Sequence, residues 1–215
     1  DRQRFRLRGP AQSTEMKSSR IRIATRRDAA KLLEIYAPYV EKTAVTFEYE
    51  VPAVTEFEKK NRSHTGKIPL FGCGKGRGYF RLCLCRSVQG PRSVSLGCGN
   101  DGIRAGRHEK KMGTGRELYA ALEKILSMQN ILNLNACIAY PCEAEDPYLT
   151  RDSVQFHKRL GYQFAGKFHR CGYKFGRWYH MIWMEKFLGG HTENPPVVKS
   201  FGEVRSLVAE KLGIW

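Results

Sequence analysis

The sequence lacks the features of a membrane protein and of a disulfide scaffold. No apolar run approaches the roughly 18 residues that a membrane-spanning helix requires, and residues 1–15 hold no apolar core of a secretory signal. The seven cysteines are an odd number without framework spacing, which is typical of a reducing compartment. We therefore expect a cytoplasmic protein without a membrane partner. Its 215 residues, 41% of them hydrophobic, suit one domain with a tail.

Positive charge is concentrated in two segments of the chain. The formal net charge is +16, of which residues 1–27 contribute +7 and residues 68–110 contribute +6. A strongly basic chain is typical of nucleic-acid-binding proteins. Charge confined to two atypical segments argues against that function, so we expect no nucleic-acid partner. A basic RNA-binding protein stays as an alternative.

Apolar periodicity is regular on both sides of residues 68–110. The expected strands span residues 21–24, 45–51, 132–138, 162–169 and 178–186. The expected helices begin near Thr25 and Thr55 and at residues 113, 153 and 204. We expect Pro38 to end the first helix and Gly161 to stop the helix at 153–160. This order of elements predicts an α+β fold with a sheet at its centre.

Residues 68–110 show neither helix nor strand periodicity, and they hold nine of the 21 glycines and four of the seven cysteines. Read one base later, codons compatible with this segment can encode three strand-like stretches, FLVAE, ILGYAYA and AVETTVYV. A Lys-Asp-Gly-Gly turn would join the first two. We therefore predict a frame shift, with one extra base near Lys67 and one missing base near Lys110. The alternative is a genuine insertion rich in glycine and cysteine.

A glycine-containing motif, Lys110-Lys111-Met112-Gly113-Thr114-Gly115, opens the helix predicted at 113–127. The glycines let the backbone approach a ligand closely. The first N–H groups of a helix lack helical partners, so this helix start suits a pyrophosphate. Arg116 adds a further positive charge beside the two lysines. A plain loop before a helix is the alternative.

This motif resembles the acetyl-CoA loop of the GNAT acetyltransferases, Gln/Arg-x-x-Gly-x-Gly/Ala, with Lys110 in the first slot. Residues 153–162, SVQFHKRLGY, are similar to the family's next helix and its Leu-Gly-Tyr/Phe end. Residues 43–52, TAVTFEYEVP, and residues 171–179, CGYKFGRWY, resemble the phosphinothricin N-acetyltransferase branch. The resemblance covers residues 20–67 and 111–187 as written, and residues 68–110 only after reframing.

The resemblance implies a GNAT fold at residues 20–187, with a mixed, splayed central sheet flanked by helices. Residues 1–19 would be a disordered basic extension, and residues 188–215 a tail with a short helix. The implied activity is acetyl transfer from acetyl-CoA to the amine of a small amino-acid-like substrate of the phosphinothricin or methionine sulfoximine type. The resemblance also implies a homodimer. An inactive frame-shifted product of such a gene is the alternative.

Site residues follow from the resemblance, each beside a simpler structural alternative. His157 falls where the family has the tyrosine that protonates the leaving thiolate, so it is the candidate catalytic residue; a packed histidine is the alternative. Tyr173, Lys174 and Trp178 would wall the acceptor pocket, or else form a hairpin with a stacked aromatic. The expected cofactor ligands are Lys110, Lys111, Met112, Gly113, Thr114, Gly115, Arg116 and Ser153.

Three further sets of residues complete the expectations. Glu48 and Tyr49 lie in the acceptor-side segment, where a structural role is favoured. The presumed general base is the glutamate of AVETTVYV, which exists only in the second frame. The cysteine spacing fits no common zinc site, so no metal is expected. The cysteines concerned are Cys73, Cys83, Cys85 and Cys98.

Overall fold

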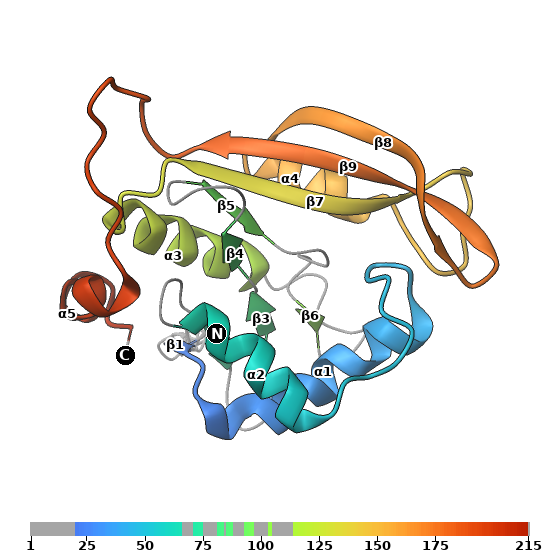
Figure 1. The fold of residues 1–215 in the computed structure, drawn as a ribbon, viewed down its shortest axis with the longest axis horizontal. Helices are drawn as coiled ribbons and strands as arrows, with labels where there is room; N and C mark the ends of the chain where they lie inside the picture. Colours follow the sequence, from blue (N-terminus) through green and yellow to red (C-terminus); the bar gives the residue numbers. More distant parts are fainter. Residues whose placement is uncertain are drawn as a thin grey trace, which may run out of the picture.

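The computed structural model describes the backbone of residues 20–65, 71–74, 81–83, 85–87, 93–96, 103–104 and 114–214. Side chains are described for residues 21–59 and 115–214. The basic extension expected at residues 1–19 lies outside the described residues. Figure 1 shows the long strands along one side of the molecule, with helices beneath and behind them.

Helices and strands alternate in the order expected of an α+β fold. The helices are α1 (Ala29–Lys42), α2 (Val54–Thr65), α3 (Thr114–Met128), α4 (Asp152–Arg159) and α5 (Phe201–Leu212). A 3-10 turn (Arg26–Asp28) precedes α1. The strands are β1 (Arg20–Ile23), β2 (Phe71–Gly74), β3 (Arg81–Cys83), β4 (Cys85–Ser87), β5 (Ser93–Leu96), β6 (Ile103–Arg104), β7 (Asn133–Pro141), β8 (Gln163–Lys174) and β9 (Arg177–Phe187).

The described strands form two sheets. One has the order β1-β2-β3-β6 and is antiparallel throughout, and the other has the order β4-β5-β7-β9-β8. In the second sheet β5 runs parallel to β7, whereas the remaining pairs are antiparallel. The expected mixed sheet is therefore confirmed, divided between two strand systems.

The main core lies between the second sheet and α3, where the predicted helical stripe is confirmed. Leu118, Leu122, Ile125 and Leu126 are all fully buried, as expected for one apolar face of a helix. From the C-terminal tail, α5 packs against α3 at one end of the molecule (Figure 1). Its buried residues Phe201, Val204 and Val208 belong to the same core cluster, so the tail helix is part of the packed domain.

The β8–β9 hairpin is closed by a two-residue turn. Phe175 and Gly176 both have positive φ, 51° and 73°, which is the conformation of a type I′ turn and matches the twist of the flanking strands. This tight turn places Lys174 and Arg177 directly opposite each other at the end of the ladder. The hairpin is longer than the two strands predicted from the sequence.

Pro38 lies inside α1 and does not end it, so that prediction was wrong. Proline removes one helical hydrogen bond, and separate contacts from a distant part of the chain hold the carbonyl groups at the end of the helix. The Lys174 ammonium donates to the carbonyl oxygens of Val40 and Thr43, at 2.7 and 3.0 Å. These contacts stabilise the helix end, and α1 continues to Lys42.

Residues 45–51 form no strand, in contrast to the prediction from their alternation. Their polar groups bond locally and to side chains: the Glu48 N–H donates to the Thr46 hydroxyl at 3.3 Å, and Lys174 donates to the Thr46 carbonyl at 2.8 Å. The alternating apolar side chains are not the buried ones: Ala44 and Thr46 are buried, whereas Val45 and Phe47 are half-buried and Tyr49 is exposed. The helix expected after Thr55 begins one residue before it.

The described residues of the segment predicted to be frame-shifted form five short strands. β2 to β6 have two to four residues each, compared with nine to twelve for β7 to β9. They pair within both sheets. Three of them, β2, β3 and β6, fall inside residues 70–74, 79–85 and 97–104, where the second-frame strands would lie. The frame shift itself stays a prediction.

Candidate active site

The expected phosphate-binding loop leads into the first turn of α3. Thr114 is the first residue of the helix, Gly115 is buried and Arg116 is exposed. The unpaired N–H groups and the dipole of a first turn favour an anion, although Glu117 places a carboxylate in the same turn. The remaining expected ligands lie outside the described residues: Lys110, Lys111, Met112 and Gly113.

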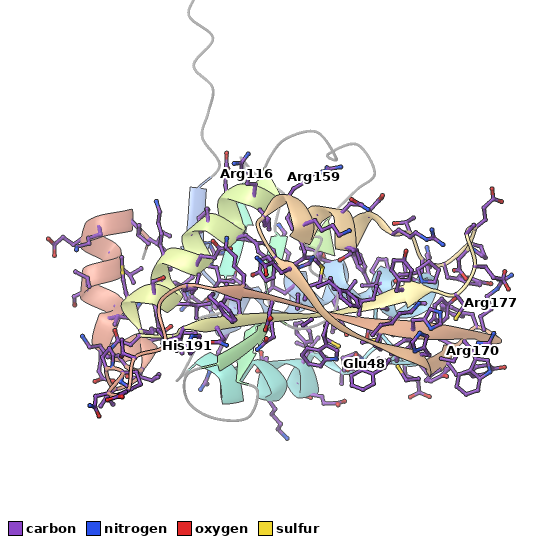
Figure 2. All side chains as sticks on the ribbon, turned by 90° about the horizontal axis from the view of Figure 1, so that it is seen from above. Glu48, Arg116, Arg159, Arg170, Arg177 and His191 are labelled. Atoms are coloured by element: carbon purple, nitrogen blue, oxygen red, sulfur yellow. The ribbon has the colours of Figure 1, made fainter. Side chains whose placement is uncertain are left out.

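Helix α4 contacts α3 and adds positive charge on the same side of the molecule. Its last turn contains Lys158 and Arg159, and Figure 2 shows Arg159 and Arg116 close to one edge of the molecule. Ser153, an expected cofactor ligand, is half-buried, and its carbonyl oxygen accepts a hydrogen bond from within α4. The start of α3 therefore lies in basic surroundings.

His157 is fully buried between α4 and α3. Its Nδ1 donates to the Ser153 carbonyl oxygen at 2.8 Å. Since a neutral imidazole carries one N–H, Nε2 is then the acceptor, and the Tyr119 hydroxyl donates to it at 3.1 Å. Both ring nitrogens are occupied, and Tyr162 packs edge-on against the ring.

The electrostatics of this site favour the neutral ring. Burial lowers the pKa of His157 from 6.5 to about 4, against the opposing effect of its hydrogen bond to Ser153. A proton carrier in a water-excluded core must exchange its proton through neighbouring groups, and here Tyr119 is buried too. The geometry thus supports the packed-histidine alternative. Sequence reasoning missed Tyr119, because a tyrosine in an apolar stripe gives no sign of the partner of its hydroxyl.

Tyr173 and Trp178 form an exposed aromatic pair on the hairpin. Their ring centroids are 4.9 Å apart, and the residues are 47% and 54% exposed. The two residues face each other across the β8–β9 ladder. The ring planes are tilted by 55°, so the two side chains pack across the hairpin without parallel stacking, and their role as a wall of the acceptor pocket stays a prediction.

Lys174 is placed differently from the other expected acceptor residues. It is 1% exposed, and its ammonium donates to three carbonyl oxygens at the end of α1 and beyond it. Burial lowers the pKa of Lys174, an effect opposed by the charge of Glu48. Because the Lys174 side chain is enclosed, it does not line a pocket. It can affect the acceptor side only through the residues to which it is hydrogen-bonded, at the end of α1 and just beyond it.

Residues 43–49 lie against the end of this hairpin. The Tyr49 hydroxyl donates to the Tyr173 carbonyl oxygen at 2.5 Å. The half-buried Glu48 carboxylate accepts a hydrogen bond of 3.0 Å from the Tyr36 hydroxyl. Figure 2 places Glu48 on the other side of the sheet from Arg116. The expected donor side and acceptor side thus lie on opposite sides of β7–β9.

Two features of the described part of the chain bear on other functions. Among the helices seen there, none combines the length and the apolar character needed to cross a membrane. The described side chains contain no group of three or more histidine, cysteine or acidic residues arranged to hold a metal ion. The side chains of Cys73, Cys83, Cys85 and Cys98 lie outside that set.

Known proteins share both the sequence pattern and the fold. Residues 105–183 match the family described as an acetyltransferase (GNAT) domain. The chain is 26% identical over 180 residues to a phosphinothricin N-acetyltransferase of Streptomyces coelicolor, covering 77% of this chain and 94% of that protein. An N-acetyltransferase of Streptomyces griseus is 27% identical over 184 residues, with 79% and 87% covered.

The fold agrees with these sequence relatives. A GNAT superfamily phosphinothricin acetyltransferase from Sinorhizobium meliloti, solved in complex with AcCoA, superposes with a TM-score of 0.68 at 22% identity. The superposition covers 85% of this chain and 95% of that one. Similarity at this identity shows the fold, which is that of the GNAT proteins. Within this fold, residues 105–183 are the part of the chain that matches the acetyltransferase (GNAT) domain family.

Proposed function

We propose that this protein transfers an acetyl group from acetyl-CoA to the amine of a small amino-acid-like substrate. The observation that carries the proposal is the two-sided arrangement, with a basic helix start on one side of β7–β9 and the Glu48 segment on the other (Figure 2). Direct transfer requires acetyl-CoA and the amine to be bound next to each other at the same time, each in its own part of the site. Phosphinothricin as the acceptor type is taken from the names of relatives that are 26% identical, and methionine sulfoximine comes from the resemblance to that branch of the family.

The start of α3 fits the pyrophosphate of acetyl-CoA. Its first N–H groups have no helical partner, and the dipole contributes on the order of 1 kcal/mol to binding an anion there. Arg116 from α3 and Arg159 from α4 add positive charge on that side. Bound there, acetyl-CoA supplies the acetyl thioester, and the residues of the chain orient the amine and handle the protons.

The acceptor side combines aromatic surface with one negative charge. Tyr173 and Trp178 offer exposed rings, which favour the apolar part and the positive charge of an amine. The Glu48 carboxylate attracts the ammonium form in which a free amine arrives. The amine loses a proton to a general base and attacks the thioester carbonyl. The C–S bond then breaks, and CoA leaves as a thiolate that takes up a proton. For the general base we propose the glutamate of the second-frame stretch AVETTVYV.

A role of His157 in proton transfer stays a proposal, and the burial of the ring argues against it. A group at this position would act through the Tyr119 hydroxyl, to which it is hydrogen-bonded. The homodimer and the cytoplasmic location are likewise proposals carried over from the resemblance.

Titration with acetyl-CoA tests the donor half of the proposal. We expect saturable binding by calorimetry, and we expect Gly113→Val to weaken it because a β-branched side chain blocks the approach of the pyrophosphate to the backbone. Ala120→Val, on the exposed part of α3, is the control for a β-branched residue elsewhere in the helix. A salt-dependent affinity for RNA without acetyl-CoA binding would favour the nucleic-acid alternative.

A further inference from the structure

The buried ammonium of Lys174 joins two parts of the chain that are far apart in sequence. Its three hydrogens are matched by three carbonyl oxygens, those of Val40, Thr43 and Thr46, at 2.7, 3.0 and 2.8 Å. Val40 lies in the last turn of α1, where carbonyl groups lack helical partners and the helix dipole favours a cation. The side chain is therefore fully satisfied without any ligand.

Two more contacts hold the same segment against the hairpin. Phe47 packs so closely over Gly172 that a Cβ atom at this glycine would lie 2.6 Å from Cε2 of the ring. The Tyr49 hydroxyl donates to the Tyr173 carbonyl oxygen. Residues 43–49 thus contact residues 172–174 at three successive positions, and Lys174 supplies the charged and most deeply buried contact.

Glu48 is the residue that this attachment orients. It lies between Phe47 and Tyr49, both of which contact the hairpin, and its carboxylate is further held by the Tyr36 hydroxyl. The negative charge of Glu48 also acts on the Lys174 ammonium. The contacts between residues 43–49 and residues 172–174 therefore set the direction in which the Glu48 carboxylate points.

We propose that Lys174 is a positioning residue that holds the Glu48 carboxylate toward the incoming acceptor, so that the site selects acceptors bearing a cationic amine. This inference rests on the proposed function, because it assumes that the acceptor enters beside Glu48. Lys174 touches neither substrate in this account. It acts through residues 43–49, and its loss weakens the acceptor interaction while leaving the start of α3 intact.

The test compares Lys174→Met with Lys174→Gln, Glu48→Gln and a matched control, Lys186→Met. Lys186 is also partly buried and donates to Glu123 and to the Leu160 carbonyl oxygen. Its replacement therefore removes a similar number of hydrogen bonds, none of them to residues 43–49. Hydrogen–deuterium exchange of the amides of residues 43–49 is measured first. We expect faster exchange there in both Lys174 variants and unchanged exchange in Lys186→Met.

Steady-state kinetics then separate positioning from simple destabilisation. We expect Lys174→Met to raise the acceptor KM by about tenfold or more, as a misplaced binding group does, with acetyl-CoA affinity unchanged. Combined with Glu48→Gln, the two effects should be far from additive, because both act on one carboxylate. Lys174→Gln keeps two donors and should give an intermediate KM, and it replaces Lys174→Met if that variant does not fold.

Three outcomes overturn the inference: unchanged exchange at residues 43–49, an acceptor KM that moves equally in Lys186→Met, or additive effects of Lys174 and Glu48 substitutions. The exchange experiment needs no catalysis. A wild-type chain that acetylates no amine would therefore contradict the proposed function. Hydrogen–deuterium exchange would still decide whether Lys174 holds residues 43–49.

Discussion

At the residue scale, burial determines what His157 can do. The resemblance predicts a proton carrier at this position, yet the ring donates to Ser153, accepts from Tyr119 and has no exposed surface. A buried imidazole with both nitrogens occupied loses hydration without gaining a negative partner, so the neutral form is favoured. Two predictions follow from this environment, one for stability and one for catalysis.

The first prediction concerns stability and pH. Because the folded pKa of His157, about 4, lies below the ordinary 6.5, the unfolded chain binds the extra proton between these values. Lowering the pH from about 7.5 to 5 should then reduce the free energy of unfolding by about 2 kcal/mol through this group. Below pH 4 the loss should level off.

Chemical denaturation of wild type and His157→Phe at several pH values measures this contribution. The variant should be less stable at neutral pH, but it should lose less stability on acidification than wild type does. Parallel pH dependence of the two proteins would mean that His157 titrates normally in the folded state.

The second prediction concerns catalysis by the same variant. A group that acts as acid or base typically contributes 10²–10⁴-fold to kcat. Since His157 is buried and fully bonded, we expect His157→Phe to change kcat by less than about tenfold, with acetyl-CoA affinity unchanged. Thiol release at saturating acetyl-CoA provides the measurement. A fall of 10²-fold or more in a folded variant would restore His157 to the proton-transfer role.

At the scale of elements, sequence periodicity predicted those parts whose burial alternates regularly. The strand β7 buries Leu134, Ala136 and Ile138 in turn, as its pattern indicated. The end of α4 was also predicted, because Gly161 has a φ of 88° that suits glycine. The type and order of these elements, and hence the fold class, were accessible from local signals alone.

The acceptor-side segment could not be predicted in the same way. Its conformation depends on Lys174, which is 134 residues from Val40 along the chain. A local pattern carries no information about such a partner, so the α1 end was placed too early and residues 45–51 were assigned to a strand. Lys174 itself was assigned to the pocket wall because its enclosure becomes visible only in three dimensions.

The third prediction tests the packing of this segment on the hairpin. Gly172→Ala introduces a Cβ atom that overlaps the Phe47 ring, whereas a Cβ atom at Gly166 on the same strand meets nothing within 4 Å. Overpacking of this kind typically costs 1–3 kcal/mol. We expect Gly172→Ala to lower the stability by about that amount and Gly166→Ala to leave it nearly unchanged. Equal melting temperatures for the two variants would contradict the contact.

At the scale of the whole molecule, both sheets include strands from residues 68–110, a segment whose composition differs from that of the rest of the chain. Residues 68–110 contribute +6 of the formal net charge of +16 and hold four of the seven cysteines. The family match begins near the end of this segment, at residue 105, and runs to residue 183. The glutamate presumed to be the general base is present only if residues 68–110 are encoded in the second reading frame.

The fourth prediction concerns the gene. Resequencing should show one base fewer near codons 67–68 and one base more near codons 110–111, which would restore the stretches FLVAE, ILGYAYA and AVETTVYV. Confirmation of the printed sequence at both places would rule out a sequencing error and would leave a true insertion or an inactive gene product.

The central claim is that the protein acetylates a small amine, and amine-dependent release of free thiol from acetyl-CoA tests it most directly. The assay takes the printed chain and its second-frame version with a panel of glutamate-like amines, and mass spectrometry identifies the product. We predict thiol release that requires both substrates, together with a product that has gained one acetyl group. Absence of amine-dependent thiol release from both chains would contradict the account.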